Sequence, residues 1–368
     1  MTRTQRRTRV TALTLGLALT LAACGGTTRD NQDEDNSDAE ETFTSEGEAS
    51  PEGLDEGEGG TGEFAEGLAI TMLPKSVNNP YFETSSEGAE AVVTELGGTY
   101  EYTGPSDASA SSQVSYINTL SQQGVDAILL SANDPNALCS SLDQASAGGA
   151  AIVTFDSDVD PACRDLFVSQ VEGEEVGRAL IEMAAEQADG AGQIAVLSAT
   201  ANATNQNAWI AVMEEELENN PDYADLELVA IAYGDDEDEK SFAETQGLLQ
   251  AHPDLEVIVA PTTVGILAAA RYVQGSDYDV AVTGLGTPND MREYVKDGTV
   301  TEFALWDPGA LGELAAWTGA ALASGIISGE GDTFTAGELG EYTVGPEGVI
   351  VLGPPTRFNA DNIDDFNF

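Results

Sequence analysis

From about Leu68 onward, short apolar runs alternate with longer stretches in which apolar residues recur every three or four positions. The runs are rich in Val, Ile, Leu and Ala, which is typical of parallel strands buried on both faces of a sheet. The longer stretches have the period of helices that cover such a sheet. Strands are expected at Leu68–Leu73, Tyr100–Tyr102, Ala127–Leu130, Ala151–Phe155, Leu166–Ser169, Gln193–Ser198, Leu226–Ala232, Val257–Ala260, Val280–Gly284 and Glu302–Trp306. Helices are expected at, among others, Glu83–Leu96, Gln113–Gln123, Glu174–Gln187, Trp209–Leu217 and Ala310–Ile326.

This repetition of strand and helix predicts the fold class. A chain of 368 residues exceeds the usual size of one hydrophobic core. Alternating strands and helices over roughly 300 residues indicate doubly wound sheets with helices on both faces. The expected architecture is therefore α/β, with two doubly wound parallel-sheet lobes.

The N-terminus has a different pattern. Four Arg among the first nine residues precede an apolar run, Val10–Ala23, which is too short to span a bilayer as a mature helix. The run ends in Leu21–Cys24, which resembles a bacterial lipoprotein signal. Residues 1–23 are thus expected to be a signal peptide, with Cys24 lipidated as the new N-terminus. An ordinary signal peptide with a chance Cys is the alternative.

Residues 24–66 are expected to be an acidic, disordered tether. They contain fifteen acidic residues and one base, with Gly, Ser and Thr between them. Such a segment buries too little apolar area to offset its chain entropy. It is expected to connect a lipid anchor at the cell membrane to the folded part, outside the cytoplasm.

The overall charge excludes several functions. The chain has 13 Lys and Arg against 65 Asp and Glu, a formal charge of −52. Such a surface repels phosphate, so nucleic-acid binding is not expected. The single His, His252, excludes a multi-His metal site and leaves little for a His-based triad. A Walker A loop and a Gly-x-Ser-x-Gly elbow are also absent, so we expect no enzyme, metal or cofactor.

Two cysteines remain beyond the signal, Cys139 and Cys163. In an oxidising compartment an even residual pair usually forms a disulfide. Two buried free thiols are the alternative.

Polar and aromatic residues follow the ends of several expected strands. Ligands of open α/β sheets bind at these carboxyl ends, and a neutral polyhydroxylated ligand needs such a mixture of carboxylates, amides and aromatic faces. The candidate ligand-binding residues are Lys75, Asn79, Tyr81, Phe82, Asp156, Asn205, Gln206, Pro261, Thr263, Trp306 and Asp307.

Several candidates have a structural alternative. Lys75 is also compatible with a solvated surface position, and Asp156 with a helix N-cap. Tyr81 and Phe82 are equally compatible with core packing. Trp209 is expected in the core rather than against a ligand.

The motifs at these strand ends resemble type I periplasmic binding proteins, the ligand-capturing components of ABC importers, over about Leu68 to Phe368. Together they are specific for the branch that holds the rhamnose-binding and autoinducer-2-binding proteins. The motifs that carry the resemblance are Leu73–Lys75, Asn79–Phe82, Tyr102–Pro105, Gln123–Ile128, Ser131–Pro135, Phe155–Asp158, Thr204–Asn207, Ala260–Gly265 and Leu305–Pro308.

The resemblance implies two lobes that close over a ligand by hinge motion, with about three chain crossings. The first lobe is expected to hold residues 67–170 and 306–333, and the second 171–305 and 334–368. The resemblance also implies a monomer that docks on an ABC permease in the membrane.

The resemblance further implies roles for the candidates. Lys75 and Asp156 are expected to hold hydroxyls from one lobe. Asn205, Gln206 and Thr263 are expected to do so from the other. Phe82 and Trp306 are expected to wall the sugar ring.

Within the branch, the evidence divides between two ligands. Autoinducer-2 binders show a Lys, two Asp, a Gln, a Pro and an Ala in the pocket, and Lys75, Asp156, Gln206 and Pro261 match four of these six. Asn205 stands where the second Asp is expected, and Thr263 where the Ala is expected. An amide in place of a carboxylate turns an acceptor into a donor and acceptor, and a mismatched buried polar group costs about 1–3 kcal/mol. The expectation is therefore a rhamnose-like aldose, with autoinducer-2 as the alternative.

Overall fold

The computed structural model describes residues 62–368. The expected signal peptide, the lipidation of Cys24 and almost all of the tether lie outside these residues. The described residues belong to a single compact unit.

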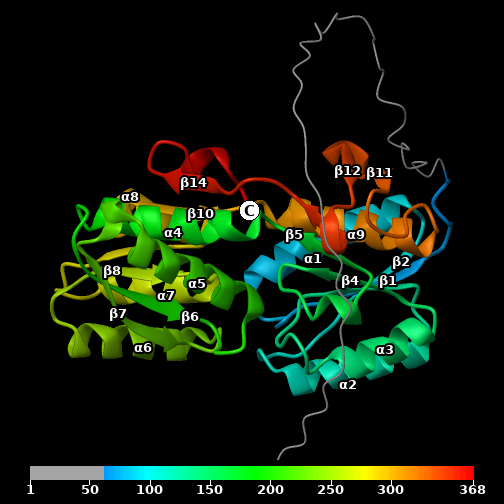
Figure 1. Ribbon diagram of the computed structural model, residues 1–368, viewed down its shortest axis with the longest axis horizontal. Coiled ribbons are helices and arrows are strands. Elements are labelled where there is room, and N and C mark those ends of the chain that lie inside the picture. The colour runs from blue at the N-terminus through cyan, green and yellow to red at the C-terminus, as the bar shows by residue number, and fades with distance from the viewer. Residues whose placement is uncertain (1–61) are drawn as a thin grey trace, which may run out of the picture. The chain divides into compact units, whose positions relative to one another are not determined.

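A six-stranded parallel sheet forms the first of two layered α/β regions (Figure 1). Its strand order is β13-β5-β4-β3-β1-β2. Helices α1 and α9 pack on one another over one face, and α2 and α3 cover the other (Figure 1). The strands are β1 (Ala69–Leu73), β2 (Thr99–Tyr102), β3 (Ala127–Leu130), β4 (Ala151–Phe155), β5 (Leu166–Ser169) and β13 (Val349–Val351), and the helices are α1 (Pro80–Glu95), α2 (Ala110–Gln123), α3 (Cys139–Ala147) and α9 (Pro308–Ala323).

A four-stranded parallel sheet of order β7-β6-β8-β9 forms the second region. Helices α4 and α5 pack together, as do α6 and α7. The strands are β6 (Gly192–Ser198), β7 (Leu226–Tyr233), β8 (Leu255–Ala260) and β9 (Ala281–Gly284), and the helices are α4 (Gly173–Gln187), α5 (Thr204–Asn219), α6 (Asp238–Ala251), α7 (Thr263–Gln274) and α8 (Pro288–Asp297).

Short strands complete the fold. β10 (Glu302–Leu305) pairs antiparallel with β14 (Thr356–Asn359), and a parallel bridge between Leu285 and Ala304 joins β10 to the end of β9. β11 (Thr333–Thr335) and β12 (Glu341–Thr343) form a hairpin. The chain passes between the two regions three times, after β5, after β10 and after β13.

The local sequence explains why these elements form where they do. β3 is buried along its whole length because helices cover both faces of the sheet. Helix α1 begins after Asn79, whose side chain accepts a hydrogen bond from the Tyr81 amide, with Pro80 at the first helical position. A Cβ on Gly312 would lie 1.8 Å from the carbonyl oxygen of Ser85, so only glycine lets α9 pack this closely on α1.

The expected α/β class with two parallel sheets is confirmed, and each expected strand matches an observed one to within two residues. One segment differs from the expectation. Residues 334–368 were assigned to the second lobe, but β13 within them pairs with β5 in the first sheet. A three-residue strand has too little periodicity to indicate its sheet, because tertiary contacts decide its pairing. The other lobe limits stay predictions.

Candidate functional site

A pocket lies where the carboxyl ends of strands from both sheets meet. Its polar lining comes from the residues that follow β1, β4, β7 and β8 and from the start of α5. The lining residues are Lys75, Asn79, Tyr81, Phe82, Asp156, Asn205, Gln206, Trp209, Asp236, Pro261, Thr262, Thr263, Leu285, Leu305 and Trp306.

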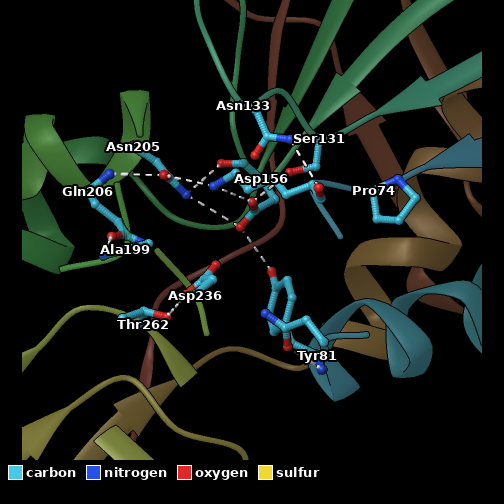
Figure 2. Close-up of polar contacts among 12 residues, drawn as sticks. Pro74, Tyr81, Ser131, Asn133, Asp156, Ala199, Asn205, Gln206, Asp236 and Thr262 are labelled. Atoms are coloured by element: carbon cyan, nitrogen blue, oxygen red, sulfur yellow. Dashed lines mark hydrogen bonds and ion pairs between the residues drawn. The ribbon is translucent and has the colours of Figure 1, made fainter. Parts of the chain in front are cut away.

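Asp156 is the centre of the polar contacts contributed by the first sheet (Figure 2). It follows β4 in a left-handed conformation with φ 60°, and it is 5% exposed. Its Oδ2 lies 3.3 Å from Lys75 Nζ and accepts a hydrogen bond of 2.8 Å from Ser131 Oγ. Its Oδ1 accepts a bond of 3.3 Å from the Tyr81 hydroxyl. The buried carboxylate is thus held in one orientation and is paired with a buried cation.

Two further side chains hold the loop that carries Lys75. Gln113 Nε2 donates to the carbonyl oxygens of Pro74, at 3.0 Å, and Ser131, at 2.8 Å. Asn133 Nδ2 donates to the Lys75 carbonyl oxygen at 3.0 Å, and the backbone amide of Asn133 donates to Gln113 Oε1 at 2.9 Å. The sequence analysis included Asn133 in the motif Ser131–Pro135 but assigned no role to it or to Gln113, because no sequence pattern marks a polar residue that supports a neighbouring loop.

The amides at the start of α5 approach this pair from the second sheet. Asn205 Oδ1 accepts a hydrogen bond of 3.1 Å from Lys75 Nζ, and Asn205 Nδ2 donates to the Asp156 carbonyl oxygen at 3.3 Å. Gln206 Oε1 accepts from Ser198 Oγ at 2.7 Å and from the Ala199 amide at 2.8 Å. Asn205 Nδ2 also donates to Asp156 Oδ1 at 3.4 Å, so Asn205 contacts both charged side chains of the first sheet.

The opposite wall carries a second carboxylate, Asp236, which accepts a hydrogen bond from Thr262 Oγ1 (Figure 2). Burial raises the pKa of Asp236, and the neighbouring carboxylates Asp156 and Asp235 raise it further, whereas Thr262 and Lys75 oppose the shift. Sequence reasoning missed Asp236. It lies just after β7, so the strand-end rule that selected Asp156 would have found it.

Aromatic rings form the apolar part of the lining. Trp306 Nε1 donates to the Tyr81 hydroxyl at 2.8 Å, and the two rings meet edge to face at 6.2 Å. Trp209 lies 6.0 Å from Trp306, and Phe82 lies 5.0 Å from Tyr81. Burial raises the pKa of Tyr81 well above its ordinary value, and Asp156 adds to the shift, so Tyr81 stays a neutral donor.

Ten of the eleven candidate residues line this pocket. The exception is Asp307, which is exposed and caps α9 by accepting hydrogen bonds from the amides of Gly309 and Ala310. It follows a strand end, but its side chain turns back to the helix that begins there. Trp209, expected in the core, lines the pocket while remaining buried.

The pocket contains only a small cavity. Its cavity is about 40 Å³, whereas pockets that hold small ligands usually measure roughly 300 Å³ or more. The Lys75–Asn205 bond joins its two sides. A ligand of sugar size does not fit into this volume.

A disulfide and an ion pair lie beside the Asp156 loop. Cys139 and Cys163 are joined, with their Cα atoms 5.1 Å apart. The neighbouring Arg164 forms a bidentate pair with Asp158, with Nε 3.0 Å from Oδ1 and Nη2 2.9 Å from Oδ2. This pair constrains the chain two residues beyond Asp156.

Across residues 62–368, no three His, Cys, Asp or Glu side chains gather as a metal ion would require. A search of the same residues finds no helix with the length and apolar character of a membrane span.

The sequence matches the model of the periplasmic binding protein domain over residues 70–326. The chain belongs to the periplasmic binding protein family. Proteins of this family are extracytoplasmic binding proteins of transport systems and not enzymes.

Three solved structures show how closely this periplasmic binding protein resembles known ones. A sugar ABC transporter protein from Actinomyces odontolyticus is 54% identical, with a TM-score of 0.66, over 82% of this chain and 98% of that one. A solute-binding protein from Clostridium phytofermentas with bound L-rhamnose is 36% identical, with a TM-score of 0.79 and the same coverage. LsrB from Clostridium saccharobutylicum in complex with AI-2 is 29% identical, with a TM-score of 0.79, over 82% of this chain and 100% of that one. The resemblance inferred from the sequence motifs is thereby confirmed for the family and the fold.

Proposed function

We propose that this protein captures a neutral monosaccharide, a rhamnose-like aldose, for an ABC importer. The observation that carries the proposal is the buried Lys75–Asp156 pair, which amides from the opposite sheet contact and aromatic rings enclose. Sugar hydroxyls both donate and accept hydrogen bonds, so they match a wall that offers a cation, carboxylates and amides together. The aromatic faces suit the C–H faces of a sugar ring.

The charge of the pocket supports an uncharged ligand. Lys75 and Asp156 neutralise each other at 3.3 Å, and Lys75 is the one basic side chain among the residues that line the pocket. A neutral ligand joins such a site without bringing an unpaired charge into it. The similarity to a protein that binds L-rhamnose, at 36% identity, supports the choice of an aldose.

We further propose that the lobes open and close about the three crossings. Contacts from Asn205 to Lys75 and Asp156 tie the two sides together, and a sugar hydroxyl can take over either contact when it binds. Hinge closure of this kind is a common way to enclose a small ligand.

Autoinducer-2 is the second candidate, and Asp236 is the observation that favours it. Sequence comparison with autoinducer-2 binders suggested a missing carboxylate at Asn205, but Asp236 brings a second carboxylate into the pocket. The similarity to an AI-2 complex at 29% identity points the same way. The preference of the pocket for one ligand or the other then depends on Asn205 and Thr263. The Thr263 hydroxyl donates to Asn79 Oδ1 at 3.3 Å.

The remaining parts of the proposal concern partners and location. We propose a lipid anchor at Cys24, a tether over residues 24–66, an ABC permease as docking partner and a monomeric state. Mass spectrometry of the protein purified from its membrane tests the anchor, because lipidation adds the mass of the acyl chains at Cys24.

A thermal-shift screen tests the ligand class. L-rhamnose, other neutral aldoses and autoinducer-2 are each added to the purified protein, and the sugar is recovered afterwards for analysis. The proposal predicts that a neutral aldose raises the melting temperature and is recovered unchanged. Stabilisation by autoinducer-2 alone would favour the second candidate.

A further inference from the structure

Asp236 is the carboxylate of the pocket that has no cation beside it. Lys75 Nζ lies 3.3 Å from Asp156 Oδ2 and donates to Asn205. In the part of the chain that the structure describes, Asp236 forms no ion pair, and its recorded partner is the neutral Thr262 hydroxyl. The pocket therefore contains one compensated carboxylate and one uncompensated carboxylate.

Asp236 also lines a second cavity, a cleft of about 510 Å³ next to the pocket. Negative side chains border this cleft on both sides, with Asp107 from the first region and Glu237 and Glu239 from the second. All three are exposed and have no ion-pair partner among residues 62–368. Asp236 thus stands at the boundary between an acidic cleft and the enclosed pocket.

We propose that Asp236 is the residue that excludes anionic ligands from the pocket, so that the protein discriminates neutral sugars from the corresponding acidic sugars. This inference rests on the proposed function and names its substrate class more narrowly.

The physical reason is the repulsion between two carboxylates in a poorly hydrated space. A ligand carboxylate near Asp236 meets a like charge where water screens it weakly. Lys75 offsets that charge only in part, because its ammonium group is paired with Asp156 and donates to Asn205. A neutral ligand meets no such penalty and offers Asp236 a hydroxyl donor instead.

The test uses three probes that share one ring: L-rhamnose, L-mannose and L-mannuronate, which carry a methyl, a hydroxymethyl and a carboxylate group at the same position. Dissociation constants are measured by calorimetry for the wild type, Asp236→Asn and the control Asp107→Asn, which removes a carboxylate from the opposite, exposed rim of the cleft. L-mannose separates the effect of size from the effect of charge.

We expect the wild type to bind L-mannose at least a hundredfold more tightly than L-mannuronate. Asp236→Asn should reduce this ratio at least tenfold by gaining affinity for L-mannuronate, and Asp107→Asn should change it less than threefold. An unchanged ratio in Asp236→Asn, with L-rhamnose still bound, overturns this inference and leaves the proposed function intact. Failure of the wild type to bind both neutral sugars overturns the proposed function and this inference with it.

Discussion

Asp156 is the side chain on which the polar contacts of the pocket converge, since Lys75, Ser131, Tyr81 and Asn205 all reach it. This convergence explains why a carboxylate after β4 adopts a left-handed conformation that only a few per cent of non-glycine residues adopt. The strain is local, and the surrounding contacts hold it. A ligand hydroxyl that donates to Asp156 therefore meets an acceptor that is already oriented.

Asp156→Asn should weaken sugar binding at least tenfold. The change removes a charged acceptor, and hydrogen bonds to charged groups contribute about 1.5–3 kcal/mol. Titration calorimetry on the purified variant measures the effect, and circular dichroism checks that it folds. Asp307→Asn is the matched control, because Asp307 caps α9 outside the pocket and Asn caps equally well. Equal affinities for wild type and Asp156→Asn would remove Asp156 from the binding site.

Asp236→Asn should make the protein more stable at neutral pH. The pKa of Asp236 is raised in the folded state by burial, so the wild type loses stability as the pH rises through that raised pKa. Asn does not ionise and can still accept the Thr262 bond. The melting temperature of the variant should exceed that of the wild type at pH 7, and the gap should narrow as the pH falls towards the ordinary pKa of Asp. A difference in melting temperature that stays constant between pH 4 and pH 7 would show that ionisation of Asp236 does not lower the stability of the folded protein.

At the scale of elements, the loop after β4 is fixed by contacts between segments distant in sequence. Arg164 pairs with Asp158 and donates to the Glu347 carbonyl at 2.7 Å. Its side chain is 2% exposed and that of Asp158 is 16% exposed. The pair therefore connects the β4 loop, the Cys163 turn and the segment before β13.

Arg164→Met should lower the free energy of unfolding by about 3–5 kcal/mol, because it leaves the largely buried Asp158 carboxylate without a cation. Urea denaturation followed by circular dichroism measures the loss. Adding Asp158→Leu to the variant should recover much of it, because an apolar pair replaces the unpaired charge. Arg178→Met, which breaks the surface pairs of Arg178 with Glu174 and Glu216, should leave the midpoint nearly unchanged. A similar midpoint for Arg164→Met and the wild type would contradict this role.

Most strands of the two parallel sheets could be predicted from the sequence, because apolar runs such as β3 alternate with helices along the chain. The short strands β11 to β14 could not, since they follow the last long helix, outside this alternation, and their pairing depends on the rest of the fold. The same limit explains the misplaced β13.

Much of the pocket lining could be predicted, because the carboxyl ends of parallel strands all lie at one edge of a sheet. That rule brought Lys75, Asp156 and Thr263 together from different strands. It failed for Asp307, whose side chain caps its own helix. The rule also could not identify Gln113, which lies inside a helix and donates hydrogen bonds to the carbonyl oxygens of Pro74 and Ser131.

At the scale of the whole molecule, the chain carries a large excess of acidic residues. With 65 acidic and 13 basic side chains, we expect repulsion between like charges to outweigh attraction between the exposed ion pairs. Salt screens such repulsion over about 10 Å at 0.1 M.

The melting temperature should therefore rise when NaCl is increased from about 0.01 M to 1 M, a range in which the screening length falls from roughly 30 Å to 3 Å. Differential scanning calorimetry at fixed pH measures the change. Glucose at matched osmolality is the control for effects other than screening, once the protein is shown not to bind it. A melting temperature that falls with salt would mean that ion pairs, and not repulsion, dominate.

The two sheets contribute complementary parts of one pocket. The first contributes the Lys75–Asp156 pair, and the second contributes Asn205, Gln206 and Asp236. Neither set lines the pocket alone.

Titration calorimetry of residues 62–368 with L-rhamnose, and then with autoinducer-2, tests the central claim most directly. The account predicts a saturable one-to-one titration with L-rhamnose that Asp156→Asn weakens at least tenfold, and no saturation with autoinducer-2. Saturation by autoinducer-2 with none by L-rhamnose would contradict the assignment to an aldose and would place the protein among the signal-binding members of its family.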